Sequence, residues 1–431
     1  MKKLVLSLSI AFGALALASC ANNAKTTSSK ETSKTTTTST STTSTSTSTT
    51  SKKDITYTVT VVDIDGEVLV DNLSLETKEG SNSIIEDLKK ANIDIVSYET
   101  NYGTSISTIA SSVVDDNYYL AFYVNDEYSQ VGAPNYEIQD GDSLKFISTC
   151  WNTIDSGYGF LDSYDVLVDK TLYHYAKTYM QDFIKADTTY ASSDYWTYMT
   201  INLMQDSYFG TNSFDARNAT NELVKSIEDT DVKTLTGANI AKYYWTSKAL
   251  GYDTSALESN FGSLISSHIE GSYSELTSPF IISPAYNLGY TSNELTDFVD
   301  NATQASTQYG TDSLAWQVAT LGMFDKYSDT TVLDNLNSRS QNGTSTAVQL
   351  MAYAALGVSP RDSKYEVDDK DLVEFLFDEF YSEDLDLVKV YKDDEGSNMS
   401  TNQIYAALAA YKVSRDLINS ASDNTKAFIF A

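Results

Sequence analysis

The chain is 431 residues long and acidic, with a formal net charge of −30 at pH 7. A surface of this charge repels nucleic acid and anionic headgroups, which excludes nucleic acid as a partner. Hydrophobic residues make up 41% of the chain, enough for the cores of two or three domains. The two histidines, His174 and His268, stand in no metal-binding spacing, so no metal is expected to be required.

The N-terminal segment has the features of an export signal. Met1-Lys2-Lys3 is positively charged, and residues 4–17 form an apolar run that is short for a membrane span. Small residues then lead into Cys20, and residues 1–19 therefore resemble a bacterial lipoprotein signal peptide. The resemblance implies that Cys20 is acylated and anchors the chain in the lipid bilayer, at the extracellular face of the cell membrane. An ordinary secretory signal or a signal anchor is the alternative.

Residues 20–53 are predicted to be a disordered stalk that follows the lipid anchor. Nearly all residues between Thr26 and Ser51 are Ser or Thr, and such a tract cannot bury a core. A flexible chain of this length spans about 25–30 Å on average. Acylation of Cys20 would leave Cys150 as the other cysteine of the chain, without a partner for an intramolecular disulfide.

Residues 54–151 are predicted to form a small α+β domain. A β-branched strand, Thr56–Val62, is followed by an Asp65-Gly66 hairpin turn and a return strand over 67–75. Ser81 and Ser83 offer caps to a short amphipathic helix over 84–91. Further strands are expected at 93–100, 118–124 and 144–149, with turns at 125–126 and 140–142. Two strands, one helix and then several strands is the order of a β-grasp-like domain.

A series of motifs in this domain resembles a known family. An aromatic-Gly-x-x-x-x-Ser-Ile-like run, residues 102–109, is followed by the aromatic strand 118–125. Gly132-Ala133, Tyr136 and Asp140-Gly141-Asp142 come next. Together they resemble the C-terminal β-domain of transcobalamin and intrinsic factor, and the bacterial surface modules that share its pattern. The match covers most of the domain and is more specific for the fold than for the ligand.

A hinge over residues 152–162 is predicted to lead into a helical domain, residues 163–431. Apolar residues at 3–4 spacing predict a helix over 164–184. Leu-Gly pairs recur at 250, 288, 321 and 356, which are 38, 33 and 35 residues apart, and each Gly is expected just after the end of a helix. This period predicts repeated helical hairpins. We favour an α/α-toroid over an open superhelix.

The toroid prediction also depends on a resemblance. Ser345-Thr346-x-x-Gln349 followed by the Ala-rich run to Leu356-Gly357 resembles the inner helices of α/α-barrel proteins. These include prenyltransferases, terpene cyclases and the α-domain of transcobalamin and intrinsic factor. A generic helical repeat with a packed interior is the alternative.

The helical domain carries no recognisable catalytic cluster. Asp368-Asp369-Lys370-Asp371 lacks the acid spacing of a terpene cyclase, and it is read as the acidic start of a helix over 372–380. Asp393-Asp394-Glu395 is read as a solvated loop rather than a calcium site. No Ser-His-Asp or Cys-His arrangement and no phosphate-binding loop is found. Binding is therefore expected rather than catalysis.

The two resemblances together imply the carrier architecture in which cobalamin is clamped between the two domains, although their order is reversed here. A corrin is a flat, mostly apolar disc rimmed with amides, and it needs aromatic walls and neutral hydrogen-bonding groups. The candidates on the β-domain are Tyr102, Tyr119, Phe122, Tyr123 and Tyr136. Those on the toroid are Asn239, Tyr243, Tyr286, Asp312, Trp316, Thr346, Gln349, Thr401 and Gln403.

Two other functions stay open at this point. The chain could be a cell-surface interaction protein that binds a protein or a glycan, which the stalk and the acidic surface fit equally well. It could also be a toroid enzyme that acts on an extracellular polysaccharide with a carboxylate pair. In the first reading the ligand is a corrinoid such as cobalamin, and a membrane transporter is a further candidate partner.

Overall fold

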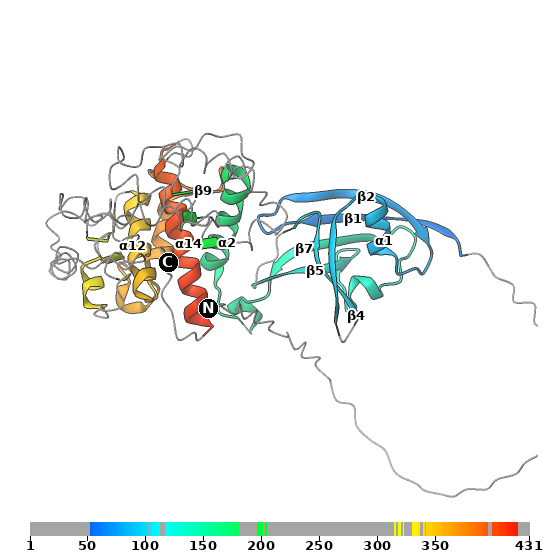
Figure 1. Cartoon of the computed structure of the whole chain (residues 1–431), viewed down its shortest axis with the longest axis horizontal. Helices are drawn as coiled ribbons and strands as arrows, with labels where there is room; N and C mark the ends of the chain where they lie inside the picture. Colours follow the sequence, from blue (N-terminus) through cyan, green and yellow to red (C-terminus); the bar gives the residue numbers. More distant parts are fainter. Residues whose placement is uncertain are drawn as a thin grey trace, which may run out of the picture. The chain divides into compact units, whose positions relative to one another are not determined.

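The computed structural model describes residues 52–100, 103–112, 117–157, 159–180, 330–336, 339–340, 342–394 and 399–420, with short helical pieces at 196–204 and 314–322. Lys52–Ala431 form one compact unit. A β-rich part, here called the β-domain (residues 54–150), precedes a helical region that starts at Ser163 (Figure 1). The expected succession of an α+β part and a helical part is confirmed.

The β-domain is built on a five-stranded sheet in the order β2-β1-β7-β5-β6. Its strands are β1 (Asp54–Val62), β2 (Val68–Lys78), β5 (Tyr118–Val124), β6 (Glu127–Tyr128) and β7 (Ser143–Cys150). β1 and β2 form an antiparallel hairpin, and β7 runs antiparallel to β5. β7 pairs in parallel with β1, so the first and last strands of the domain are neighbours in the middle of the sheet.

Alternation along β1 explains how the sheet acquires a core. Ile55, Tyr57, Val59 and Val61 are buried on this strand. They share a core with the buried face of α1 (Ile84–Lys90), which packs beside the sheet (Figure 1). A strand with one buried face presents every second residue to the core, whereas an amphipathic helix presents residues three and four apart. The predicted strand and helix are both confirmed.

Tight turns set the remaining strand order. Gly66 has φ of +89°, which the β1–β2 turn requires and which favours glycine. Asn125 and Asp126 both have positive φ, 52° and 68°, as a two-residue hairpin turn between β5 and β6 needs. A second sheet pairs β3 (Ile95–Thr100) with β4 (Gly103–Ile109). β4 was not predicted as a strand, because its Thr and Ser residues give little alternation between apolar and polar.

The expected cap of α1 takes a different form. Ser83 occupies the N-cap position, but its side chain makes no capping hydrogen bond. Its hydroxyl instead donates to Asp87, one turn into the helix, at 2.5 Å. Asp87 is buried and also accepts from Tyr57. A buried carboxylate needs several donors, and this need outweighs the cap.

The helical region contains three long helices among its described residues, which are α2 (Ser163–Tyr175), α12 (Gly343–Leu356) and α14 (Met399–Asn419). The shorter elements are η3 (Ala176–Met180, a π-helical turn), η7 (Thr330–Leu336), η8 (Ser363–Tyr365), α13 (Leu372–Phe380), β8 (Tyr381–Ser382) and β9 (Leu387–Val388). Two further 3-10 turns, η1 (Ala133–Asn135) and η2 (Ile154–Ser156), precede it. None of the helices in the described part has the length and apolar character needed to cross a membrane.

Helix ends test the repeat prediction. α12 ends at Leu356, and Gly357 follows with φ of +66°, so this Gly is the predicted helix-ending residue. Gly322 differs, because it lies in a helix and its φ is not positive. A Cβ at Gly322 would come within 2.4 Å of the Ala355 carbonyl oxygen, so this glycine permits close packing of two backbones. The Leu-Gly pairs at 250 and 288 lie outside the described residues.

The acidic start of α13 is confirmed. Asp371 is its N-cap and forms a capping box with Glu374, in which each side chain bonds to the backbone of the other. Asp368 and Asp369 precede it with φ of 55° and 61°. Aspartate tolerates this left-handed conformation better than most residues, which explains the acidic run without a metal.

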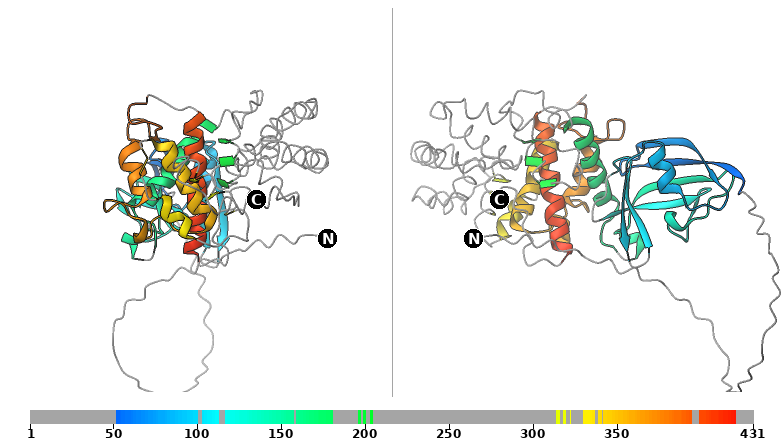
Figure 2. Two further views of the ribbon diagram at one scale, coloured as in Figure 1. Left: turned by 90° about the vertical axis from the view of Figure 1, so that its left-hand side faces the viewer. Right: turned by 45° about the vertical axis from the view of Figure 1, so that its right-hand side comes forward.

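The last long helix packs against the first and against α12 (Figure 2). Between α2 and α14, the rings of Tyr175 and Tyr405 stack with centroids 3.7 Å apart. Tyr411 donates to Asp165 at 2.7 Å, and Arg415 donates to Asp169 at 2.9 Å. All of these side chains are buried, so α2 and α14 are joined by rings and by ion pairs.

A second arginine extends this set of ion pairs to α13. Arg361 donates to both carboxylate oxygens of Asp162 at 2.6 Å, and also to Asp165 and Asp371. Burial by itself lowers the pKa of Arg361, but its hydrogen bonds to Asp162 and the charge of Asp165 raise the pKa above its usual value. We call Asp162, Asp165, Asp169, Arg361 and Arg415 the α2 charge cluster.

Replacing Arg361 tests how much the α2 charge cluster stabilises the fold. The substitution Arg361→Gln leaves three carboxylates with less compensation, and removing one partner of a buried pair costs about 3–5 kcal/mol of unfolding free energy. Urea unfolding followed by circular dichroism measures the loss. The matched control is Lys53→Gln, which breaks an exposed pair with Asp140 and is expected to leave the midpoint unchanged. Equal midpoints for the two variants would contradict the cluster's role.

Candidate functional site

The β-domain has an open groove of about 340 Å³ between β4, β5 and the loop that follows β6. Its floor contains Leu120, Phe122 and Phe146, which belong to the core of the domain or pack against it. Its rim includes Thr104, Ser105, Tyr119, Tyr128, Ser129 and Gln130. Every described residue that lines this space is uncharged. We call it the β5 groove.

Strand alternation in β5 places an aromatic on each side of the strand. Phe122 is 7% exposed and stacks on Phe146, with ring centroids 5.1 Å apart. Tyr119 is 38% exposed at the rim of the groove. Strand alternation points positions 119 and 122 to opposite faces, so the groove that both residues line extends around the edge of β5 that β6 leaves uncovered. The groove thus has a fixed apolar floor and a rim that reaches solvent.

Tyr128 completes a cluster of tyrosines at the rim. Its ring meets the ring of Tyr123 edge to face at 5.6 Å, as their pairing across β5 and β6 requires. Burial, followed by a hydrogen bond with Tyr128, raises the pKa of Tyr119 above its usual value. The Tyr119 hydroxyl therefore stays neutral at physiological pH and can donate or accept a hydrogen bond.

Tyr136 is fixed beneath this cluster. Its ring contacts Phe122 edge to face at 5.8 Å, and its hydroxyl donates to Asp142 at 2.8 Å. Asp142 also accepts from the backbone of Gln139 and from the side chain of Asn125. The Asp-Gly-Asp motif therefore holds both Tyr136 and the β5–β6 turn in position.

The structure brings four of the five predicted β-domain residues together. Tyr119 and Phe122 line the groove, Tyr123 contacts its rim through Tyr128, and Tyr136 packs behind Phe122. Tyr102 lies outside the described residues. Sequence reasoning missed Tyr128, although a tyrosine two residues after an Asn-Asp turn must lie opposite Tyr123 in a hairpin. The loop residues Ser129 and Gln130 carried no such signal.

The predicted toroid residues are less concentrated. Asn239, Tyr243, Tyr286, Asp312 and Trp316 lie outside the described residues, as does the predicted lipidation site, Cys20. The described candidates divide into two groups. Thr346, Gln349 and Thr401 are fully buried, and Gln403 is half-buried. Ligand contact by these four stays a prediction, and the burial of three of them lends it no support.

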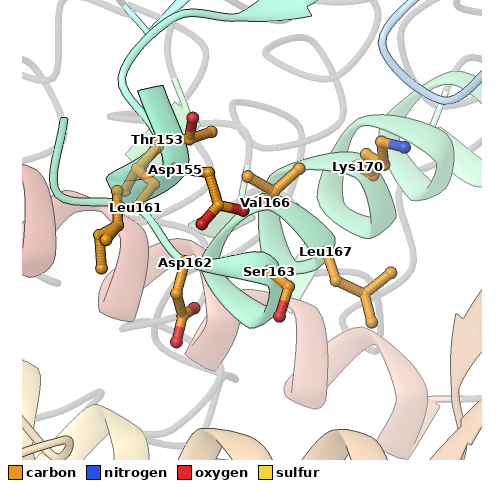
Figure 3. Close-up of a pocket in the computed structure, with 9 residues that line it drawn as sticks. Thr153, Asp155, Leu161, Asp162, Ser163, Val166, Leu167 and Lys170 are labelled. Carbon is orange, nitrogen blue, oxygen red and sulfur yellow. The ribbon is translucent and has the colours of Figure 1, made fainter. Parts of the chain in front are cut away.

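A second cavity, of about 550 Å³, lies where the predicted hinge meets α2 (Figure 3). Val166 and Leu167 of α2 form an apolar wall, and Asp155, Asp162 and Lys170 bring charge to the lining. Asp162 is already held by Arg361. This hinge cavity therefore differs from the β5 groove in its charged lining, and it suits a neutral ligand less well.

The described residues contain no group of three or more His, Cys, Asp or Glu side chains arranged to hold a metal ion. In the acidic loop after β9, Asp394 accepts a hydrogen bond from the backbone of Tyr391 at 3.0 Å and so closes a local turn. Glu395 lies outside the described part. The side chain of Asp394 therefore stabilises the local turn of this loop.

Comparison with known proteins gives one family match. Residues 82–148 match a family described as "Domain of unknown function (DUF4430)". The match begins just before α1 and ends within β7, so it includes every residue that lines the β5 groove. No curated protein matches the chain.

The hydroxyl of Tyr136 provides a pH test of the geometry beneath the groove. Burial and the hydrogen bond to Asp142 raise the pKa of Tyr136 to about 12. Because the unfolded value is about 10, this contribution to stability is present below pH 10 and is lost as the pH rises to about 12. The ultraviolet absorbance difference between the wild type and Tyr136→Phe should show tyrosinate forming near pH 12. A difference that titrates near pH 10 would contradict the buried hydrogen bond.

Proposed function

We propose that this chain is a lipid-anchored extracellular binding protein that captures a neutral ligand in the β5 groove. A corrinoid such as cobalamin is the leading candidate. The observation that carries the proposal is the uncharged lining of the groove in a chain with a net charge of −30. In such a chain, a groove without charged side chains favours a ligand without strong charge.

The chemistry of the groove fits the edge of a corrin. Apolar floor residues accept the flat face of the disc, and the neutral hydroxyl and amide groups of Tyr119, Tyr128 and Gln130 can bond to its rim of amides. A groove of about 340 Å³ takes only part of so large a ligand. The part of the ligand that the groove does not cover would contact a second surface of the protein. The resemblance to transcobalamin and intrinsic factor assigns that second surface to the helical domain.

The proposal also assigns a specific fold to each of the two parts of the chain. The central parallel pair of β1 and β7, with α1 between the first hairpin and the later strands, supports a β-grasp-like domain related to the transcobalamin C-terminal domain. The packing of α14 on α2 supports closure of the helical region into an α/α-toroid. A row of hairpins that does not close would keep its first and last helices apart.

A second candidate function is a surface module that binds a glycan. Tyr128 and Val131 are 52% and 48% exposed at the rim of the groove, which is open to solvent. Exposed tyrosines beside Ser and Gln side chains can stack on a sugar ring and bond to its hydroxyls. Glycan binding that persists when cobalamin binding is absent would favour this function.

Ligand binding by the groove is tested with the full chain and cobalamin. Equilibrium dialysis is expected to show binding, and Tyr119→Ala is expected to weaken it about tenfold, because the substitution removes an aromatic ring and a hydroxyl from the lining of the groove. The control is Tyr391→Ala, because Tyr391 is an exposed tyrosine in the helical region and lines no part of the groove. Absence of cobalamin binding by the wild type would overturn the corrinoid proposal.

Lipid anchoring is tested by Cys20→Ser. The variant is expected to move from the membrane fraction to the soluble fraction, because a chain without its acyl groups loses the apolar contact that retains it. Cys150→Ser serves as the control and is expected to stay with the membrane. Equal membrane retention of both variants would contradict acylation of Cys20.

A further inference from the structure

The β1–β2 turn makes a polar contact with the start of the helical region. The Tyr173 hydroxyl of α2 donates to Asp63, which is 2% exposed. Ile64, next to it, is also 2% exposed and belongs to the hydrophobic core of the helical region. The hairpin turn is therefore inserted into the helical core, and separating the two would expose both residues.

His174 lies in this contact between two acidic turns. Its Nδ1 is 3.6 Å from Asp65 Oδ2 in the β1–β2 turn, and 3.7 Å from Asp386 Oδ2 in the turn between β8 and β9. Nε2 faces the hydroxyl of Thr178 at 3.4 Å. The Asp65 side chain is 4% exposed, so it depends on protein groups for compensation of its charge.

We propose that this contact is a pH-sensitive latch, in which the imidazolium ion of His174 ties the β1–β2 turn to the helical region between Asp65 and Asp386. When His174 loses its proton, the two carboxylates lose the positive charge they share, and the turn is held less tightly. The proposal is independent of the ligand that the β5 groove binds.

The other charged groups around His174 do not replace it. Lys177, one turn further along the chain, lies 3.8 Å from Asp65 and pairs with Glu67 of the same turn. Tyr381 donates to Asp386 and carries no charge. With neutral His174, Asp65 and Glu67 keep Lys177 as a described cation, whereas the described ion pair of Asp386 is lost. Excess negative charge then accumulates at a buried contact.

The direction of the pH effect follows from linkage. The close approach of the Asp65 carboxylate, together with the charge of Asp386, raises the pKa of His174 above its ordinary value of 6.5. A raised histidine pKa means that the stabilisation is fully present below pH 6.5 and is lost as the pH rises through the folded value. The latch is therefore tight in mildly acidic surroundings and weaker in alkaline ones.

Thiol trapping measures how often the turn opens. Ile64→Cys places a thiol in the buried contact, in a full chain in which Cys20 and Cys150 are replaced by Ser. Its rate of reaction with a dithiopyridine reagent is compared with that of the same chain carrying His174→Gln, at pH 5.5, 7.0 and 8.5. The ratio of the two rates removes the effect of pH on the thiol itself. Labelling with His174 present is expected to be several-fold slower at pH 5.5, where the imidazolium ion holds the turn, and the difference between the two rates is expected to shrink as the pH rises to 8.5.

A measurement on the unsubstituted side chains guards against misfolding of the cysteine variants. The chain has only two histidines, so a histidine-labelled sample gives two ring signals by nuclear magnetic resonance, and His268→Gln assigns them. His174 is expected to titrate above 6.5, and Asp386→Asn is expected to lower its pKa. A rate ratio that does not change with pH, or a His174 pKa at or below 6.5, would overturn the latch.

Discussion

The carboxylates of α2 determine how the helical region is held together. Asp162 caps α2 and is partly exposed, whereas Asp165 and Asp169 on its first two turns are buried, and buried acids without a cation would destabilise the helix. Arg361 and Arg415 reach them from distant parts of the sequence, one before α13 and one from α14. The charges therefore specify which helices must meet, because any other pairing would leave acids buried without a cation.

The β-domain uses a different principle at its groove. Its structural acids are engaged locally, with Asp142 holding Tyr136 and Asp87 holding Tyr57 and Ser83. Neither of these carboxylates lines the groove, and so the groove presents rings, hydroxyls and amides. At this groove of a strongly acidic chain, apolar contacts and hydrogen bonds to neutral groups, rather than charges, would therefore select the ligand.

Local patterns predicted much of this fold. Tyr118–Val124 and Leu372–Phe380 have the predicted bounds, because an aromatic β-branched run and an acidic cap with an apolar face are strong signals. The turns at Gly66 and Asn125 followed from residues that tolerate positive φ. β4 escaped prediction because its run of Thr and Ser shows no clear period, and Gly322 was misread because the same glycine can end a helix or let two helices approach.

The candidate site was predictable only in part, for a related reason. The aromatic residues of β5 indicated a candidate binding surface from the sequence alone. The other rim residues come from β4, β6 and the loop after β6, and only the tertiary fold brings these segments beside Tyr119. The contacts of His174 with Asp65 and Asp386 likewise join three places far apart in sequence. The residue pattern within one segment predicts a helix or a strand, whereas a binding site depends on which segments contact one another in the folded chain.

The parallel pairing of β1 and β7 also decides how the β-domain bears mechanical load. The chain enters the sheet at Asp54, the start of β1, and leaves it at Cys150, the end of β7. In a parallel pair these two points lie at opposite ends of the ladder, and Thr58 opposite Ser143 and Val62 opposite Ile147 show the common direction. Tension along the chain would shear the two strands past each other, so that all hydrogen bonds between them resist together instead of unzipping one by one. Forced unfolding is governed by the rate of that first rupture, and the central position of the pair places the resistance in the core of the domain.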